Sequence, residues 1–506
     1  MAFYSTAEQS ASRIALAYLD GKKYTYREIN ELSNRISRFL LLNNIRKGDV
    51  VAIFNDKSPY AYSLMLACLK TGVTYTNLDH TNPWERLRKI IVTCHPVAIF
   101  YDDNQLDIIG EIKKTFAAIS RIHYHAPTFL DAVNTLEHGN MDLTQGVHGG
   151  EPAYIMFTSG STGFPKGAVM SHNNVLNFIQ WGRQTFDITD DDIFTNVNPI
   201  YFDNSVFDFY TSLFSGATLV PLDHGIVKNT KLLVQAINQT RCTIWFSVPS
   251  LLVYLLTTKT LAKADFLTVR RIAFGGEGFP KNKLKQLFDL VGERITLFNV
   301  YGPTECTCIC SSYTITEKDF ENMSELAPLG YIAPNFGYEI IPSVEGNPNY
   351  GELALIGPCV GLGYFNDAER TSTSFIQNPD KEYHELMYKT GDIVERAENG
   401  YLFFKGRVDN QIKHMGYRIE LEEVEAAFSS LDYINEVGVI YEKITPELGQ
   451  IKAFVSVADK EKDPKEIQRD IKAILPSYMI PTIQLMDSLP KNRNGKIDRK
   501  QLAAIV

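Results

Sequence analysis

The 506-residue sequence contains no run of 18 apolar residues, so it offers no candidate for a membrane-spanning helix. Its first residues, MAFYSTAEQSASR, lack the positive start and apolar core of a secretory signal. The seven cysteines are scattered and odd in number, which excludes a dense disulfide framework. A net charge of −9 leaves no basic excess for general nucleic-acid binding. These absences predict a soluble, cytoplasmic protein with no nucleic-acid or membrane partner.

The remaining composition is that of a globular protein with more than one domain. Hydrophobic residues make up 44% and charged residues 22% of a chain that exceeds the usual length of one domain. In residues 1–150, helical patterns at 25–44 and 59–72 alternate with strand patterns at 49–55 and 96–103. This alternation predicts parallel βαβ units with helices on both faces of a sheet.

One stretch, YIMFTSGSTGFPK (154–166), carries the strongest chemical signal. An apolar strand ending at Phe157 runs into hydroxyl residues and glycines only, followed by a lysine. Glycines let backbone N–H groups face a ligand, and hydroxyls and lysine add donors and charge for phosphate oxygens. A plain Ser/Gly turn between two strands is the alternative. The predicted phosphate-binding residues are Thr158, Ser159, Gly160, Ser161, Thr162, Gly163 and Lys166.

This loop is neither of the common nucleotide-binding loops. The NTPase pattern G-x-x-x-x-G-K-[ST] does not fit, and no G-x-G-x-x-G follows a strand here. From Thr158 to Gly167 the sequence instead resembles the signature [ST]-S-G-[ST]-[ST]-G-x-P-K-G of the adenylate-forming enzymes. The resemblance extends from about residue 10 to 502, with five motifs in family order. It is closest to amino-acid adenylation domains of the nonribosomal peptide synthetase type.

The resemblance implies an α/β fold in two parts. A large N-terminal domain, residues 1–408, would contain βαβ-type subdomains and a β-barrel-like subdomain. A small α+β lid domain, residues 409–506, would follow a hinge at Asp409. The lid would turn between two half-reactions, removing Lys496 from the site and bringing in the segment near Lys413 and Gly416.

Asp203 is the second informative residue, because it lies in the aromatic and aliphatic run 198–222. A carboxylate in such surroundings is costly unless a cation pairs with it. From the residues alone, an N-cap of the predicted helix 204–214 explains Asp203 equally well. The resemblance favours the other interpretation, because the acid in this F-D-x-S position holds the substrate's α-ammonium in amino-acid-activating members.

The third stretch is Asn299–Glu305, NVYGPTE, which matches the family's N-x-Y-G-P-T-E. Tyr301 offers an aromatic face for adenine, and Thr304 a hydroxyl for the α-phosphate. Glu305 is a carboxylate suited to Mg²⁺, which takes one or two carboxylates plus substrate phosphates. The alternating cysteines that follow are predicted to share one face of a strand as pocket or core thiols, and their spacing argues against zinc. They are Cys306, Cys308 and Cys310.

Further nucleotide contacts and the catalytic lysine are implied by resemblance alone. Thr390-Gly391-Asp392 resembles the motif whose acid binds the ribose hydroxyls, and Arg407 lies in a motif that contacts the nucleotide. Lys496 lies in the closing motif, whose lysine reaches the reacting carboxylate and phosphate. With Thr304 and Glu305 it forms the predicted catalytic set. The predicted nucleotide-binding set also includes Asn299, Gly302, Gly276 and Glu277, the last two in a tight turn after a strand.

The side-chain pocket is also taken from the resemblance. Its predicted residues are Asn204, Phe207, Ser247, Ala273, Gly275, Val300, Cys308 and Ile309. The neighbouring sequence is similar to D-alanine–carrier ligases, which carry a cysteine at the position of Gly275. Gly275 together with Ala273 and Ser247 predicts a deeper pocket, and hence an apolar or aromatic L-amino acid first and D-alanine second.

The implied activity is a two-step ligation. ATP and Mg²⁺ would convert an amino acid to an aminoacyl adenylate with loss of pyrophosphate, and the phosphopantetheine thiol of a carrier protein would then take the aminoacyl group. No carrier-domain signature occurs in the sequence, so the carrier would act in trans or have been removed. The alternatives are a D-alanine–carrier ligase, an acyl-CoA synthetase and a non-catalytic scaffold. Asp203 argues against the synthetase, and the presence of Lys496, Glu305 and Asp392 against the scaffold.

Overall fold

The computed structural model describes residues 2–142, 146–160, 162–379, 381–445, 449–458, 462–492 and 497–505. The chain divides into two compact units, each described separately below. Unit 1 consists of Met1–Leu78, His95–Met156 and Ala168–Gly406. Unit 2 consists of Asp79–Cys94, Phe157–Gly167 and Arg407–Val506. The division at residue 409 into a core and a moving lid stays a prediction.

The first half of unit 1 is built on a seven-stranded sheet of order β18-β8-β7-β4-β3-β5-β6. β3, β4, β5 and β6 are parallel to their neighbours, and β4 is parallel to β7, so the predicted βαβ arrangement is confirmed. The strands are β3 (Val50–Ile53), β4 (Thr74–Asn77), β5 (Ala98–Tyr101), β6 (Ser120–His123), β7 (Pro152–Thr158), β8 (Lys166–Ser171) and β18 (Gly363–Tyr364).

Local sequence signals set the helices that connect these strands. α2 (Tyr26–Leu42) begins with a capping box between Thr25 and Glu28, which satisfies backbone N–H groups at its start. α3 (Pro59–Thr71) begins after the capping hydroxyl of Ser58 and ends at Gly72. Gly72 has φ of 71°, the left-handed conformation that a side chain would disfavour. The predicted helices 25–44 and 59–72 are therefore confirmed within two residues at each end.

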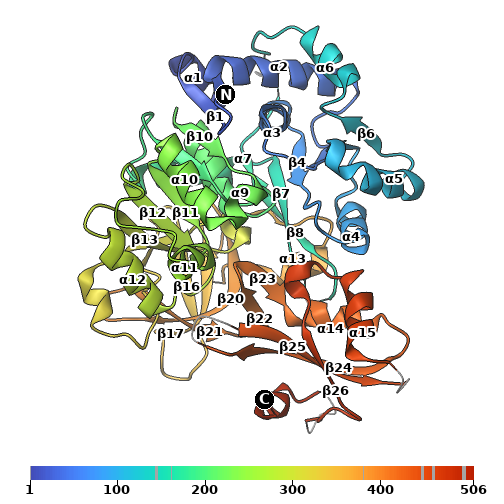
Figure 1. Cartoon of the computed structure of the whole chain (residues 1–506), viewed down its shortest axis with the longest axis vertical. Coiled ribbons are helices and arrows are strands. Elements are labelled where there is room, and N and C mark those ends of the chain that lie inside the picture. Colours follow the sequence, from blue (N-terminus) through green and yellow to red (C-terminus); the bar gives the residue numbers. More distant parts are fainter. Residues whose placement is uncertain are drawn as a thin grey trace. The chain divides into compact units, whose positions relative to one another are not determined.

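The second half of unit 1 is built on a nine-stranded sheet of order β15-β14-β13-β12-β11-β9-β10-β1-β2, in which β11, β12 and β13 are neighbours (Figure 1). β12 and β13 are parallel, with Gly275 opposite Val300. The strands are β1 (Ile14–Ala17), β2 (Lys23–Thr25), β9 (Ile193–Asn196), β10 (Thr218–Pro221), β11 (Ile244–Ser247), β12 (Arg271–Gly275), β13 (Thr296–Tyr301), β14 (Ser311–Thr314) and β15 (Tyr331–Ile332). Ligands bind beyond the carboxyl ends of parallel strands, where Gly276 and Gly302 follow β12 and β13.

A third sheet in unit 1 has the order β16-β17-β20-β19, with β21 also paired to β20. Its strands are β16 (Gly337–Pro342), β17 (Tyr350–Ile356), β19 (Phe375–Gln377), β20 (Leu386–Arg396) and β21 (Leu402–Arg407). The glycine-rich segment 351–367 does not fold into a single hairpin. β17 pairs with β16 and β20, whereas β18 pairs with β8 in the first sheet. The glycines there allow the chain to leave one sheet and enter another.

Unit 2 has a small core of its own. β24 (Ile434–Lys443), β25 (Gly449–Val457) and β26 (Thr482–Leu485) form one sheet, and β22 (Gln411–His414) pairs with β23 (Tyr417–Glu420). α14 (Leu421–Ser429) and α15 (Pro464–Lys472) bury apolar residues in this core, Ile467 and Ile471 of α15 being fully buried. Their spacing of four residues places both on one helical face. α4 (Trp84–Cys94) and α16 (Arg499–Ala504) also belong to unit 2.

The remaining helices of unit 1 are α1 (Ala2–Gln9), α5 (Leu106–Thr115), α6 (Pro127–Asn134), α7 (His172–Thr185), α8 (Asn204–Val206), α9 (His224–Lys228), α10 (Thr230–Thr240), α11 (Pro249–Thr257), α12 (Lys281–Val291) and α13 (Ala368–Ser374). Short 3₁₀ segments are η1 (Asp103–Gln105), η3 (Thr304–Cys306), η4 (Glu317–Phe320) and, in unit 2, η5 (Ser477–Met479). The π-helical segment η2 (Phe207–Thr211) follows α8. Among the helices of the described residues, none is both long and apolar enough to cross a membrane.

His172 at the first position of α7 gives the fold a predicted sensitivity to acid. Burial lowers its pKa from 6.5 to about 4, and its Nε2 atom is buried without a hydrogen-bond partner among the described residues. The pKa of His172 is lower in the folded protein than in the unfolded chain, so protonation of His172 favours unfolding. The stability that depends on neutral His172 is therefore complete above pH 6.5 and is lost as the pH falls toward 4. The loss by pH 4 is up to about 3 kcal/mol.

We therefore expect His172→Gln to flatten the dependence of thermal stability on pH between 7 and 4. Thermal unfolding of the wild type and the variant at intervals across this range measures the difference. Parallel curves for the two proteins would contradict the prediction.

Candidate functional site

The predicted phosphate loop lies between β7 and β8. Gly163 has φ of 78°, so the turn needs a residue without a side chain there. The Thr158 hydroxyl is buried and has no hydrogen-bond partner in the described part of the chain. A buried hydroxyl is normally paired, and a phosphate oxygen would supply that partner. Ser161 lies outside the described residues.

Asp203 does not cap the helix that it precedes. It occupies the N-cap position of α8, but its side chain makes no capping hydrogen bond with that short helix. Instead its Oδ2 atom accepts a hydrogen bond from the Thr304 hydroxyl at 2.5 Å, across 101 residues of sequence. The tertiary structure therefore rules against the capping interpretation and joins two residues that belong to different sequence motifs.

This contact has a chemical consequence. In an aminoacyl adenylate, only the α-carbon, the carbonyl carbon and one oxygen separate the ammonium nitrogen from the α-phosphorus. A site for that molecule must therefore hold its ammonium-binding and phosphate-binding groups within a few ångströms of each other. Asp203 and Thr304, predicted from their motifs to take these two groups, satisfy this requirement.

Tyr301 and Asp392 are a second pair that the fold brings together. The Tyr301 hydroxyl donates to Asp392 Oδ2 at 2.6 Å, and the two residues are 91 positions apart. Burial, reinforced by the charge of Asp392, raises the pKa of Tyr301, so the hydroxyl stays protonated and remains a donor. The residues predicted to contact adenine and ribose are thus adjacent, as the two parts of one nucleoside require.

Glu305 is fully buried in η3, immediately after Thr304. Its Oε1 atom accepts a hydrogen bond from the hydroxyl of Tyr364 in β18 at 2.8 Å. A buried carboxylate oriented in this way fits Mg²⁺, because that ion needs only one or two carboxylates when substrate phosphates complete its shell. The sequence interpretation missed Tyr364, since the segment GLGYFND carries no pattern that links it to Glu305.

Most residues of the predicted side-chain pocket are buried. Phe207 in η2 packs its ring 5.1 Å from that of Phe186 and 5.4 Å from that of Phe246. Ser247 accepts a hydrogen bond from the Trp245 indole at 2.8 Å and donates to Val248 O. The buried members of the set are Phe207, Ser247, Ala273, Val300, Cys308 and Ile309. Asn204, the first residue of α8, is only partly buried.

Gly275 does not leave the space that its lack of a side chain predicted. A Cβ atom placed on Gly275 would lie 2.3 Å from the carbonyl oxygen and 2.7 Å from a methyl group of Val300. Strand β13 therefore fills the position beside Gly275. The glycine serves close packing of two strands and opens no space of its own, and the deeper pocket inferred from Gly275, Ala273 and Ser247 together stays a prediction.

The cysteines after Glu305 do not lie on a strand. Cys306 ends η3, and both Thr307 and Cys308 have positive φ, 58° and 76°. Such backbone strain in residues other than glycine is concentrated at functional sites. The prediction that Cys306, Cys308 and Cys310 share one strand face is therefore wrong, although all three are buried as expected. Within the described ranges, no cluster of three potential ligands could hold a metal ion.

The remaining nucleotide-site predictions of unit 1 lie on strand β13 and on the turns that follow β12 and β13. Gly276 has φ of 92° and begins the turn after β12, and Glu277 Oε1 accepts from the Ser250 N–H at 2.8 Å. Asn299 donates to the carbonyl of Pro328 at 2.8 Å. A Cβ atom on Gly302 would lie 2.3 Å from the carbonyl oxygen of Cys308, so only glycine fits there.

The predicted hinge is held by an ion pair. Arg407 donates to Asp409 through two hydrogen bonds of 2.6 Å. Burial alone would raise the pKa of Asp409, but Arg407, the Gln411 N–H and the charge of Arg418 together lower it. Lys413 lies on β22, and Gly416, with φ of 81°, turns the chain from β22 into β23. Lys496 lies outside the described residues.

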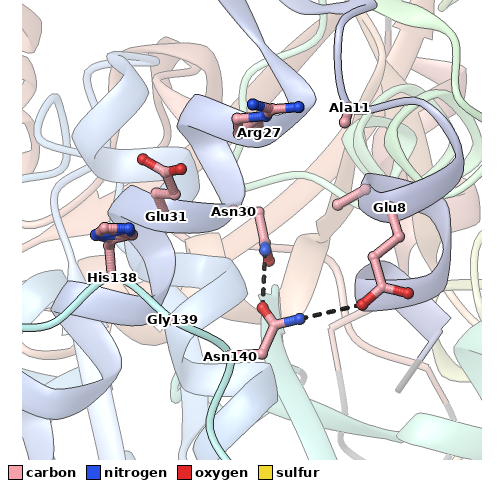
Figure 2. A pocket seen from close by; sticks show the side chains of 9 residues that line it. Glu8, Ala11, Arg27, Asn30, Glu31, His138, Gly139 and Asn140 are labelled. Carbon is pink, nitrogen blue, oxygen red and sulfur yellow. Dashed lines mark hydrogen bonds between the residues drawn. The ribbon is translucent and has the colours of Figure 1, made fainter.

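A surface depression of about 460 Å³ lies elsewhere in unit 1, between α1, α2 and the segment 138–140 (Figure 2). Asn140 accepts from Asn30 at 2.9 Å and donates to Glu8 at 3.3 Å. Beneath it, the buried Lys70 donates to Asn30, Ser33 and Asn34. The depression shares no residue with the predicted sites.

Comparisons with known proteins bear on the family and the fold. The pattern of the AMP-binding enzyme family matches residues 3–365, and that of the AMP-binding enzyme C-terminal domain matches residues 423–496. An L-proline–[L-prolyl-carrier protein] ligase of Streptomyces coelicolor is 30% identical over 98% of this chain and 94% of its own. A D-alanine–D-alanyl carrier protein ligase of Listeria monocytogenes is 33% identical over 95% and 94%. A dimodular nonribosomal peptide synthase of Bacillus subtilis is 32% identical over 99% of this chain, which spans 20% of that protein.

Solved structures share the fold. An adenylation domain of Vibrio cholerae in complex with glycyl-adenosine-5'-phosphate superposes with a TM-score of 0.84 at 24% identity, over 99% of this chain and 97% of its own. An o-succinylbenzoate CoA synthetase of Bacillus subtilis superposes with a TM-score of 0.86 at 22% identity, over 99% and 98%. The fold is therefore common to enzymes with different acid substrates. On the sequence match, this chain belongs to the AMP-binding enzyme family, as a ligase-type enzyme related to amino acid–carrier protein ligases.

Proposed function

We propose that the chain activates an amino acid with ATP, forming an aminoacyl adenylate and pyrophosphate, and then transfers the aminoacyl group to the phosphopantetheine thiol of a carrier protein. The observation that carries the proposal is the contact between Asp203 and Thr304. It provides an anion for the substrate ammonium beside a hydroxyl for the α-phosphate. An acyl-CoA synthetase needs no such anion, because its substrate has no ammonium group.

In this proposal each group has one task. Tyr301 and Asp392 hold the nucleoside, and the loop 158–166 holds the phosphates. Lys496 neutralises the charge that develops between the substrate carboxylate and the α-phosphate, where fixed cations lower the barrier most. Mg²⁺ on Glu305 would neutralise phosphate charge. Arg407, Asp409, Lys413 and Gly416 keep their predicted roles in nucleotide contact, hinge movement and thioester formation.

We propose a small apolar amino acid as the substrate. The related ligases act on L-proline and D-alanine, which are both small and apolar. The filled space beside Gly275 removes one of the reasons to prefer a large aromatic side chain. D-Alanine and L-proline are therefore the first substrates to test, followed by larger apolar L-amino acids.

The test is amino-acid-dependent exchange between ATP and radiolabelled pyrophosphate, with the twenty standard amino acids and D-alanine. We expect exchange with one small apolar amino acid, and a loss of about a hundredfold or more in Lys496→Ala, which removes the charge stabilising the transition state. Lys491→Ala is the matched control, because Lys491 lies only five residues before Lys496 in the sequence and forms an ion pair with Glu436 of β24. Exchange that depends only on a fatty or aryl acid would refute the role of Asp203.

A further inference from the structure

Two glutamates of the C-terminal segment contact the predicted phosphate loop inside unit 2. The Gly160 N–H donates to Glu423 Oε2 at 3.1 Å. Lys166 Nζ lies 3.5 Å from Glu420 Oε1. Both glutamate side chains are almost completely buried, with 4% and 5% of their surface exposed. The donors predicted to bind phosphate therefore bind carboxylates of β23 and α14.

Arg86 of α4 completes this arrangement. It forms a buried ion pair and hydrogen bond with Glu423, and its own side chain is 7% exposed. One carboxylate thus accepts from a backbone N–H of the loop and from a guanidinium. A buried pair of this kind contributes little net stability, but it fixes the geometry of the groups it joins.

Further contacts bring the loop 158–166 close to the segment 418–426. The Ser159 hydroxyl donates to Arg418 O at 2.8 Å and accepts from the Glu420 N–H at 3.2 Å. A Cβ atom on Gly163 would lie 2.8 Å from the Cβ atom of Ala426 in α14. Gly163 therefore serves the turn of the loop and also the close approach of α14.

We propose that Glu423 competes with the nucleotide's phosphates for the loop, so that ATP must displace α14 from Gly160 before the loop can bind it. The proposal rests on the proposed function, which assigns the loop to phosphate binding. A single N–H group donates to one strong acceptor at a time, so the carboxylate and a phosphate oxygen exclude each other at Gly160. Glu423 is a positioning residue, which acts by holding the C-terminal segment on the loop.

The size of the effect follows from population shift. If the loop is accessible in only a fraction of molecules, the apparent Kd for ATP exceeds the intrinsic Kd by the inverse of that fraction. Replacing the carboxylate of Glu423 by a neutral amide weakens a charge-assisted hydrogen bond and its ion pair. We expect Glu423→Gln to lower the apparent Kd for ATP by about tenfold.

The experiment measures binding of ATP and of adenosine to the full chain by calorimetry at fixed salt. Adenosine lacks phosphates, so its Kd should be the same in the wild type and Glu423→Gln. Glu422→Gln is the matched control, because the preceding glutamate of α14 pairs with Arg499 and Asn410 rather than with the loop. It should change neither affinity.

A double variant separates competition from charge alone. If Glu423→Gln strengthened ATP binding only by exposing the charge of Arg86, the gain would vanish in Arg86→Gln/Glu423→Gln, and the proposal would be overturned. If the gain persists in the double variant, displacement from the loop explains it. Should Glu423→Gln not fold, Glu423→Asp withdraws the carboxylate from Gly160 while keeping its charge, and the same tightening is expected.

The outcomes also separate this inference from the function on which it rests. A wild-type chain that binds neither ATP nor adenosine would refute both. A wild-type chain that binds ATP, with Glu423→Gln binding it equally or more weakly, would refute only the competition at the loop.

Discussion

Asp203→Asn is expected to lower kcat/KM for the amino acid in pyrophosphate exchange by about a hundredfold or more. Truncating one partner of a buried, hydrogen-bonded charge pair costs about 2–5 kcal/mol, and each 1.4 kcal/mol is a factor of ten. Asparagine keeps the size of the side chain and can still accept from the Thr304 hydroxyl. The variant therefore removes only the charge that the substrate ammonium needs.

The expected loss is selective for one substrate. KM for ATP should change by less than a few-fold, because the groups assigned to nucleoside and phosphates are intact. Asp131→Asn serves as the control, since Asp131 is an exposed residue of α6 with no part in the site. An Asp203→Asn enzyme with wild-type kcat/KM for its amino acid would show that another group binds the ammonium.

Lys57→Met is expected to cause the largest loss of stability among the changes considered. Lys57 Nζ donates to the carbonyls of Asn196 and Leu222 at 2.7 and 2.8 Å. Asp208, fully buried in η2, accepts from the side-chain amides of Asn196 and Asn198 at 2.9 and 3.0 Å. Burial lowers the pKa of Lys57 to about 7 and raises that of Asp208 to about 7, and each charge partly opposes the shift of the other.

Removing the lysine leaves the carbonyls of Asn196 and Leu222 without their donor, and Asp208 without the nearby charge that opposes its raised pKa. Leaving buried polar groups unsatisfied costs about 1–3 kcal/mol each, so we expect a loss of about 3 kcal/mol, which corresponds to a fall of roughly 4 °C in the midpoint of thermal unfolding for a unit of this size. Differential scanning calorimetry at pH 7.5 measures it. Lys231→Met, on the exposed face of α10, should leave the midpoint unchanged within a degree.

A second substitution identifies the cause. In Lys57→Met/Asp208→Asn no buried charge remains uncompensated, so part of the lost stability should return, with a coupling of about 0.5–3 kcal/mol between the two sites. Additive losses would mean that Lys57 acts only through its two carbonyl contacts. The pair is of interest for the site because η2 also carries Phe207 of the predicted pocket.

The sequence by itself determined those features that depend only on residues close together along the chain. Capping residues and the Gly72 terminus defined helices, apolar runs defined the strands of parallel βαβ units, and the glycine–hydroxyl run marked the loop 158–166. NVYGPTE marked Thr304 and Glu305 as predicted site residues through its resemblance to a family motif. Each of these signals lies within a few residues, where backbone conformation and side-chain type decide the structure.

Tertiary structure alone decided which of these residues meet. Asp203 and Thr304 are 101 positions apart, Tyr301 and Asp392 are 91 apart, and Gly160 and Glu423 are 263 apart. No period or spacing links such positions. The same holds for the space beside Gly275, which strand β13 fills. From local sequence, Asp203 could equally be a helix cap or an ion-binding group. Only the packing of distant strands brought Asp203 to Thr304, because a hydrogen bond depends on distance in space and not on distance along the chain.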